Sequence, residues 1–236
     1  MTTTFLDAAW RKLIMANYAV DPALLAPHLP YGTALDRYQG TCYLSLVGFM
    51  FQDTRVRGWK IPFHVDFEEV NLRFYVRRQQ GESWKRGVVF LKEIVPRRAL
   101  SFVARAVYGE PYVTLPMSHT WLHNETQWTV AYQWGKGLRH RLQVVTGNTP
   151  RDIAAGSEEE FIAEHYWGYT RLAAHKTAEY EVAHPRWQVY DTKDHLIEVN
   201  FGELYGAKFD FLKEEQPLSV FLAEGSAIQV KKGITL

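Results

Sequence analysis

The chain has 236 residues, a formal net charge of +1 at pH 7, and a composition that is 47% hydrophobic, 14% aromatic and 22% charged. This composition is typical of a folded globular protein and excludes a disordered chain. The 27 basic and 26 acidic residues nearly balance, so no excess positive charge attracts nucleic acid. We interpret residues 1–236 as a single domain, because no linker divides them.

The cysteine count and the N-terminus predict a cytoplasmic protein. Cys42 is the only cysteine, which excludes an intrachain disulfide and a multi-thiolate metal site. The first residues lack the basic and unbroken apolar regions of a signal peptide. The longest nearly apolar stretch, Tyr43–Phe51, is too short to span a bilayer as a helix, so we expect no membrane partner.

Short strands dominate the first half of the sequence. Patterns of apolar and β-branched residues predict strands over Trp10–Val20 and Thr41–Gln52. Between them, Asp21 and Pro22 are typical of the start of a helix, which we expect to end near Pro30.

The run Phe67–Val76 predicts a strand with two contrasting faces, because successive side chains point to opposite sides of a sheet. Its apolar face consists of Val70, Leu72, Phe74 and Val76. Its polar face consists of Glu69, Asn71, Arg73 and Tyr75. The next run, Gly87–Leu91, is apolar throughout, which predicts a strand covered on both sides. If the two runs pair as a hairpin, the polar face is enclosed as well.

Three interpretations of this polar face remain open. Enclosing a carboxylate and a guanidinium costs several kcal/mol unless they pair or bind something, so the face could form one wall of a ligand pocket. It could instead be a solvated outer surface. The third alternative is a structural ion pair between Glu69 and Arg73 in a closed interior.

A second helix is predicted after Pro96 and ends at Gly109. Arg97 and Arg98 lie at its start, where the helix dipole disfavours positive charge. An anion, a carboxylate such as Glu93, or solvent could offset them, and the sequence leaves their role open.

The second half alternates strands with one clear helix start. Ser157 and Glu160 form a capping box, which predicts a helix toward Tyr166 that stops at Gly168. The segment 203–212 is ambiguous, and 218–232 resembles a hairpin that turns at Glu224 and Gly225. The other predicted strands are Met117–His123, Thr126–Trp134, Leu138–Thr146, Thr177–Val182 and Trp187–Tyr190.

So many short strands with few helices predict a mainly β fold with flanking helices, in the α+β class. A curled antiparallel β-barrel is favoured because closure removes exposed strand edges. Eight tryptophans and thirteen tyrosines leave enough aromatic surface for a homo-oligomer interface, and the oligomeric state stays open.

The sequence lacks several common catalytic motifs. It contains no Gly-rich phosphate loop, no dinucleotide fingerprint and no Gly-x-Ser-x-Gly elbow, so no nucleotide cofactor is expected. His119 and His123 have the spacing of a helical metal pair, but in a strand they lie about 13 Å apart, so we expect no metal there. His165, near a predicted helix end, is either a pocket residue or a hydrogen-bonded spacer in an aromatic cluster.

Six segments together carry a resemblance to a known family: Asn17–Pro22, Pro62–His64, Phe67–Val76, Gly87–Phe90, Glu164–Gly168 and His184–Trp187. Through them the chain resembles, nearly end to end, the bacterial domain of unknown function 2071 family. The family has no settled activity, and it is grouped with folds similar to acetoacetate decarboxylase. The resemblance therefore implies a curled β-barrel with flanking helices.

Acetoacetate decarboxylases use a Schiff-base lysine attended by a glutamate and an arginine, and three segments here are similar to theirs. Arg11 lies in the segment that resembles the one supplying the arginine, and Glu69 falls at the glutamate position. The segment Ala104–Tyr112 resembles the helix that ends in Gly-x-Pro-Lys, with Pro111 retained and Tyr112 in place of the lysine. A phenol cannot form a Schiff base, so this resemblance implies no decarboxylation by that route.

Two functions remain after this departure, and the sequence does not decide whether the protein is an enzyme. A non-covalent lyase, hydratase or isomerase could act on a small carbonyl or carboxylic acid compound, with Glu69 moving protons and Tyr112 stabilising an oxyanion as catalytic residues. Alternatively, a non-catalytic protein could bind such a compound. In both cases the expected substrate-binding residues are Arg11, Asn71, Arg73, Tyr75 and His165.

Overall fold

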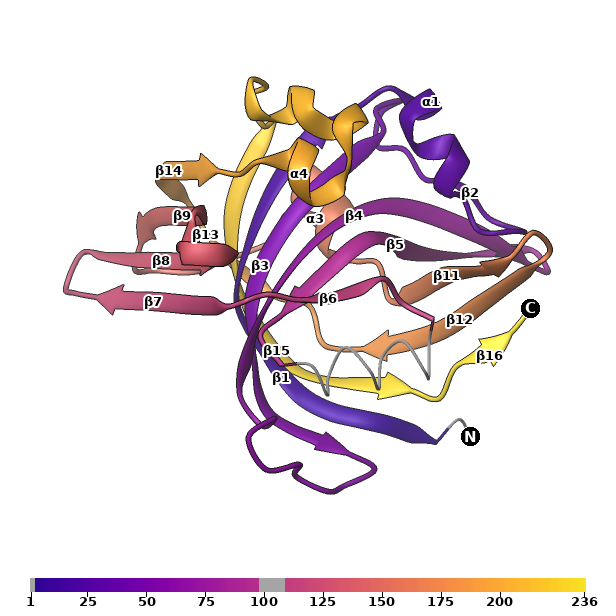
Figure 1. Ribbon diagram of the computed structural model, residues 1–236, viewed down its shortest axis with the longest axis horizontal. Helices are drawn as coiled ribbons and strands as arrows, with labels where there is room; N and C mark the ends of the chain where they lie inside the picture. The colour runs from indigo at the N-terminus through magenta and orange to yellow at the C-terminus, as the bar shows by residue number, and fades with distance from the viewer. Residues whose placement is uncertain (1–2, 98–108) are drawn as a thin grey trace.

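The structure is a computed structural model that describes residues 3–97 and 109–236. A large, strongly curled sheet forms its body, and a smaller sheet projects from one side (Figure 1). The helix predicted after Pro96 and Arg98 lie outside the described residues. Within the described residues, no helix is long and apolar enough to cross a membrane.

Long strands of the large sheet pair in a ring, because β12 pairs with both β11 and β15. In ring order these strands are β1 (Thr4–Ala19), β3 (Tyr43–Val56), β4 (Phe67–Gln80), β5 (Ser83–Val95), β11 (Trp167–Ala173), β12 (Lys176–Ala183) and β15 (Ser219–Lys231). Short strands extend the sheet: β2 (Ala34–Leu35), β6 (Tyr112–Thr114), β10 (Arg151–Asp152), β13 (Gln188–Tyr190) and β16 (Ile234–Thr235). The mainly β, curled architecture is confirmed, but β5 pairs in parallel with β6 and β11, so the sheet is not purely antiparallel.

The smaller sheet forms the projection on the left of Figure 1. Its strands, in sheet order, are β14 (Thr192–Glu198), β9 (His140–Gly147), β8 (Gln127–Trp134) and β7 (Met117–His123). The meander predicted for β7 to β9 is confirmed, whereas β14 was not predicted. Its residues Thr192–Glu198 are largely polar and exposed, so they lack the alternation that marks a half-buried strand.

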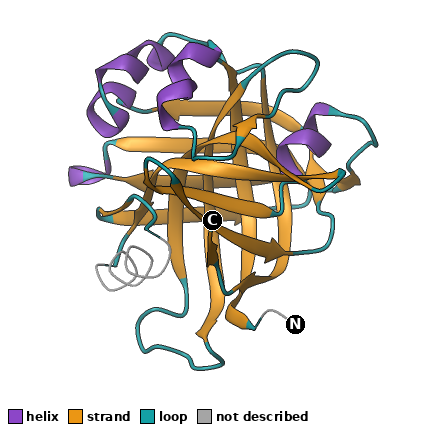
Figure 2. Ribbon diagram, turned by 90° about the vertical axis from the view of Figure 1, so that its right-hand side faces the viewer, coloured by secondary structure: helices purple, strands orange, loops and turns teal. Residues whose placement is uncertain are grey.

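Helices are few and short, and they lie at several places around the sheet (Figure 2). They are α1 (Pro22–Leu25), η1 (Ala26–His28), η2 (Lys136–Leu138), α3 (Glu158–Ala163), α4 (Phe201–Tyr205) and η3 (Ala207–Lys213). The predicted caps are confirmed: Asp21 accepts a hydrogen bond from Ala23 N, and Ser157 accepts one from Glu160 N. The ambiguous segment 203–212 is helical.

Two predicted boundaries are wrong, and in both cases a glycine serves close packing rather than a turn. The helix α3 ends at Ala163, and Gly168 lies within β11. β15 runs unbroken through Gly225 instead of turning there. Gly225 has φ 80°, and a Cβ atom at this position would lie 2.1 Å from the carbonyl oxygen of Trp10 on β1.

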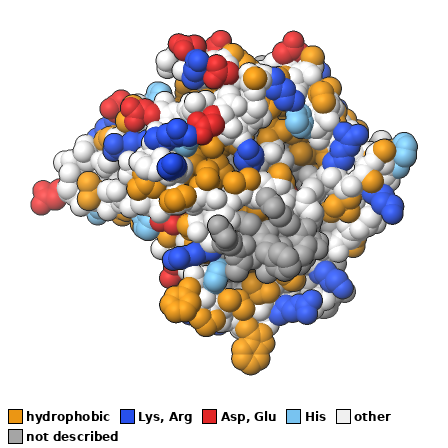
Figure 3. All heavy atoms as spheres, viewed as in Figure 1, with side chains coloured by type: hydrophobic (Ala, Val, Ile, Leu, Met, Phe, Trp, Pro, Cys, Tyr) orange, Lys and Arg blue, Asp and Glu red, His pale blue; other side chains and the backbone are white. Residues whose placement is uncertain are grey.

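The hydrophobic core has two parts, one on each face of the curled sheet. On the outer face, the predicted apolar stripe of β4 packs under the smaller sheet and under α4 and η3. Inside the curl, side chains of β1, β3 and β4 pack together with α3. The polar stripe of β4 therefore faces the interior of the curl. Acidic and basic side chains both lie on the outer surface seen in Figure 3.

Candidate functional site

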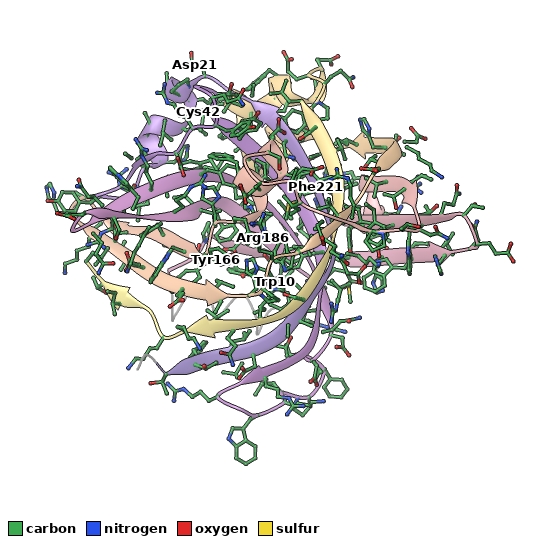
Figure 4. All side chains as sticks on the ribbon, turned by 180° about the vertical axis from the view of Figure 1, so that it is seen from behind. Trp10, Asp21, Cys42, Tyr166, Arg186 and Phe221 are labelled. Atoms are coloured by element: carbon green, nitrogen blue, oxygen red, sulfur yellow. The ribbon has the colours of Figure 1, made fainter. Side chains whose placement is uncertain are left out.

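The curled sheet surrounds a cavity of about 180 Å³. Most of its wall is aromatic or aliphatic, and Trp10, labelled in Figure 4, belongs to this wall. Trp10 makes edge contacts with Phe49 and Phe51 of β3 and with Trp187. Polar side chains also reach the wall, among them Glu69, Asn71, Arg73, Glu93, Glu110, Tyr112 and His165.

The polar stripe of β4 lines this cavity. Glu69, Asn71 and Arg73 are only 2%, 1% and 7% exposed, so the alternative of a solvated outer face is wrong. The predicted hairpin is confirmed, because β5 pairs beside β4 in the same sheet. Within the described part of the chain, no ion pair joins Glu69 to Arg73, which contradicts the structural-pair alternative.

Glu69 is held by two other residues of the cavity wall. One carboxyl oxygen accepts a 3.1 Å hydrogen bond from Asn71, and the other accepts a 3.2 Å hydrogen bond from the Tyr112 hydroxyl. Burial raises the pKa of Glu69 to about 7, and the Glu110 carboxylate adds to this rise. The side chain can therefore hold or release a proton near neutral pH.

Two further buried carboxyls, Glu93 and Glu110, share this end of the cavity and were missed in the sequence. Burial raises the pKa of Glu110 to about 7. Burial, followed by the charges of Glu110 and Glu69, raises the pKa of Glu93 well above its usual range. Glu110 accepts hydrogen bonds of 2.7 Å from Thr170 and 2.9 Å from Tyr180. Negative charges this close together repel one another. The three carboxyl groups therefore favour a state in which they share protons over one in which all three are ionised.

One sequence signal could have identified Glu93. Glu93 is a charged residue in a largely apolar strand. In the hairpin of β4 and β5, it lies opposite Asn71. A polar residue opposite the polar stripe shares its face. Glu110 gave no such signal, because its place in the cavity depends on how the segment before β6 packs against β11 and β12.

Tyr112 lies at the start of β6, opposite Glu93 in the parallel pairing with β5. Burial, together with the Glu69 and Glu93 charges, raises its pKa well above the usual value for a tyrosine. The hydroxyl therefore keeps its proton and acts as a hydrogen-bond donor. This environment disfavours proton release by Tyr112 and leaves it the hydrogen-bonding role expected from the sequence.

Arg73 lies in the cavity wall, and none of the described residues forms an ion pair with it. Its Nε atom is buried and has no hydrogen-bond partner, and no carboxylate of the described residues lies within 4.0 Å of its guanidinium. The guanidinium lies beside the Tyr75 ring, whose centroid is 5.8 Å from Cζ of Arg73. A buried guanidinium without a partner is costly, so this arrangement favours an anionic ligand.

His165 lines the cavity and is bonded to Asp36, which the sequence analysis did not identify. Its Nε2 lies 3.2 Å from Oδ2 of Asp36, and the same oxygen accepts a 2.7 Å hydrogen bond from Nε of Arg86. Burial lowers the pKa of His165 to about 4. A helix end would favour a charged imidazolium, but α3 ends at Ala163 and burial keeps the His165 ring neutral.

Two predicted binding residues, Arg11 and Tyr75, do not line the cavity. Trp10 lines the cavity, so the alternation of side chains along β1 turns its neighbour Arg11 to the other face of the sheet. Arg11 instead donates a 3.2 Å hydrogen bond to the carbonyl of Gly225. Tyr75 lies behind the wall, with its hydroxyl 2.7 Å from Oγ of Ser45. Arg97 is also outside the cavity lining.

No lysine lines the cavity in the described ranges, and residues 98–108 contain none in the sequence. Among residues 3–97 and 109–236, no group of three His, Cys, Asp or Glu side chains is arranged to hold a metal ion.

The mainly β, curled architecture is similar to the fold of acetoacetate decarboxylase-like proteins. A family model for the domain of unknown function 2071, described as "Uncharacterized conserved protein", matches residues 7–227, so the chain belongs to that family. It is similar to the uncharacterized protein YqjF of Bacillus subtilis (strain 168), with 31% identity over 104 residues. That match covers 44% of this chain and 41% of YqjF, so it spans about two-fifths of the relative's length.

Solved structures show the same fold at low sequence identity. Acetoacetate decarboxylase from Legionella pneumophila superimposes with a TM-score of 0.67 at 12% identity, covering 98% of this chain and 87% of that one. An acetoacetate decarboxylase-like enzyme from Sphingomonas wittichii RW1 gives 0.67 at 12% identity, covering 99% and 94%. The enduracididine biosynthesis enzyme MppR complexed with pyruvate gives 0.65 at 13% identity, covering 100% and 91%.

Proposed function

We propose that the cavity binds a small carbonyl or carboxylic acid compound with an apolar body and that the protein acts on it as a non-covalent lyase, hydratase or isomerase. The observation that carries this proposal is the buried guanidinium of Arg73, which has no counterion among the described residues and lines a cavity that also holds protonatable carboxyls. A guanidinium binds a carboxylate through two parallel hydrogen bonds. A carboxylate ligand would thus give Arg73 a counterion, and the bidentate geometry would fix the orientation of the ligand.

The acidic end of the cavity supplies the groups for proton transfer. Glu69, with a pKa of about 7, would take a proton from the carbon next to a carbonyl group and return it at another position. Tyr112, which keeps its proton, would donate a hydrogen bond to the enolate oxygen that forms. Asn71 holds the carboxyl group of Glu69 in place through a 3.1 Å hydrogen bond.

The chemistry proposed here needs no covalent intermediate. The lack of a lysine in the cavity wall agrees with the replacement that we infer at Tyr112, so Schiff-base decarboxylation is not part of the proposal. MppR, which shares the fold, is complexed with pyruvate in its solved structure. A 2-oxo acid of that kind is thus a reasonable first ligand to test.

The largely apolar wall supports one alternative, a protein that binds such a compound without reacting with it. Apolar walls supply affinity, while a few polar groups supply orientation, which is enough for occupancy alone. Both functions need Arg73 to bind the carboxylate. Only the catalytic function also needs Glu69 to transfer protons.

Two measurements test the proposal and separate the alternatives. A melting screen with 2-oxo acids and aryl-substituted carboxylic acids should show stabilisation of the wild type, since a ligand at a hundred times its Kd adds about 2.7 kcal/mol. The proposal fails if no acid raises the melting temperature.

Catalysis is measured in deuterated water by NMR, which follows the replacement of the hydrogen on the carbon next to the carbonyl by deuterium. Glu69→Gln should slow it by about a hundredfold or more while binding persists. A protein that binds but never exchanges supports the alternative.

A further inference from the structure

The Asp36 carboxylate accepts hydrogen bonds from several donors. Its Oδ2 accepts from Nε of Arg86 at 2.7 Å and lies 3.2 Å from Nε2 of His165, and its Oδ1 accepts from the backbone N–H of Arg37 at 3.0 Å. Burial raises the pKa of Asp36, but the hydrogen bonds with His165 and Arg86, together with the charge of Arg86, outweigh burial and lower the pKa to about 2. Asp36 is therefore a carboxylate, which can only accept hydrogen bonds.

This carboxylate determines which nitrogen of His165 carries the proton. A neutral imidazole has one N–H group and one nitrogen with a lone pair. Because Nε2 faces a carboxylate, Nε2 carries the proton and Nδ1 carries the lone pair. Nδ1 is buried and has no donor among the described residues. The histidine thus presents an unused hydrogen-bond acceptor, which is costly to bury.

Arg73 and His165 lie beside the same aromatic ring. The centroid of the Tyr75 ring is 4.8 Å from the His165 ring and 5.8 Å from Cζ of Arg73. Both residues line the cavity, whereas Tyr75 lies behind its wall. One ligand can therefore meet an unpaired cation and an unused acceptor a short distance apart.

Resting on the proposed function, we infer that the ligand is a hydroxy acid: Arg73 binds its carboxylate, and Nδ1 of His165 accepts a hydrogen bond from a hydroxyl group close to that carboxylate. The hydroxyl supplies the one donor that the site lacks. A carboxylic acid without a hydroxyl leaves Nδ1 buried and unpaired, so the site discriminates against it. Asp36 is a positioning residue that keeps the lone pair on Nδ1.

The test compares mandelate with phenylacetate, which differ by one hydroxyl next to the carboxylate. Calorimetry on the wild type should give a Kd for mandelate that is about threefold to tenfold lower than that for phenylacetate. In His165→Phe, which keeps a flat ring but no nitrogen, the two Kd values should become equal. Asp194→Asn, which changes an exposed aspartate on β14, should keep the wild-type preference.

A second measurement needs no ligand and covers the case in which His165→Phe does not fold. Nitrogen-15 NMR of the wild type at pH 6 should show His165 as a neutral ring protonated at Nε2. In Asp36→Asn, which removes the charge that favours this form, signal from the Nδ1-protonated form should appear.

The outcomes separate this inference from the proposed function. A charged His165 at pH 6, a proton on Nδ1 in the wild type, or equal wild-type affinities for both acids would overturn the inference while leaving carboxylate binding intact. Failure of both acids, and of every other carboxylic acid, to bind would remove the proposed function and this inference with it.

Discussion

The Tyr180 ring packs directly on the backbone of Gly168, so that a Cβ atom at this position would lie 2.2 Å from Cζ of Tyr180. The hydroxyl of the same ring donates a 2.9 Å hydrogen bond to Glu110. The paired strands β11 and β12 bring the two residues opposite each other. The missing side chain at Gly168 thus allows Tyr180 to reach a carboxyl in the cavity wall.

We therefore predict that Gly168→Ala lowers the free energy of unfolding by about 1–3 kcal/mol, because the added methyl group must displace the Tyr180 ring. Urea unfolding at pH 7 measures the change. Gly147→Ala on β9 is the matched control, since no atom lies within 4 Å of a Cβ built there, and it should leave stability nearly unchanged. Equal effects of the two substitutions would show that the Gly168–Tyr180 contact is not tight.

The raised pKa of Glu69 predicts a pH dependence of stability. Its pKa is about 7 in the folded protein and 4.5 ordinarily, so the folded state binds this proton more tightly than the unfolded state. The resulting stabilisation is fully present below pH 4.5 and is lost as the pH rises through 7. Glu69→Gln cannot ionise, so the variant should gain about 1–3 kcal/mol over the wild type between pH 4.5 and pH 7.5.

Unfolding curves for both proteins across this pH range check the prediction, and the informative quantity is the difference between them. Glu82→Gln, which removes an exposed carboxyl from the turn between β4 and β5, serves as the control. A wild-type minus Glu69→Gln difference that stays constant with pH would mean that Glu69 is ionised throughout the range.

Much of the site was predictable from local pattern. Alternation along Phe67–Val76 correctly separates the buried apolar stripe from the polar stripe, and two of these polar residues, Glu69 and Arg73, are central to the site. The pattern works because a strand in a two-faced sheet can pair in only one register without exposing its apolar side chains.

The other parts depend on packing between segments that are distant in sequence. Asp36 approaches His165 only because the chain after β2 hydrogen-bonds to β4, through Asp36 N and Tyr75 O. On β1, Trp10 and Leu13 both line the cavity although they are three residues apart, because Lys12 adopts a positive φ and the register shifts there. No local signal marks such a bulge when the residue is not a glycine.

The cap of α3 provides a prediction about local stability beside the cavity. Oγ of Ser157 accepts a 3.1 Å hydrogen bond from Glu160 N, and Ala163, the last residue of this helix, lines the cavity. Ser157→Ala should cost about 1 kcal/mol in urea unfolding, while Ser157→Thr, which keeps the acceptor, should cost less. If both variants cost the same, the cap hydrogen bond contributes nothing measurable.

Arg73 predicts a conflict between stability and binding. Replacing an unpaired buried charge by an apolar side chain removes a desolvation cost, so Arg73→Met should raise the free energy of unfolding without ligand by about 1 kcal/mol or more. The same variant should lose the stabilisation that carboxylic acids give to the wild type.

Arg78→Met on the same strand is the matched control, because Arg78 pairs at 3.1 Å with the buried carboxylate of Glu179, which Lys85 also contacts. This variant should lose about 1–2 kcal/mol and keep carboxylate binding. Opposite signs for the two arginines are expected because Arg78 has its counterion in Glu179, whereas Arg73 has none among the described residues. If Arg73→Met is destabilised as much as Arg78→Met, then Arg73 already has a partner in the folded protein, and the argument for an anionic ligand is lost.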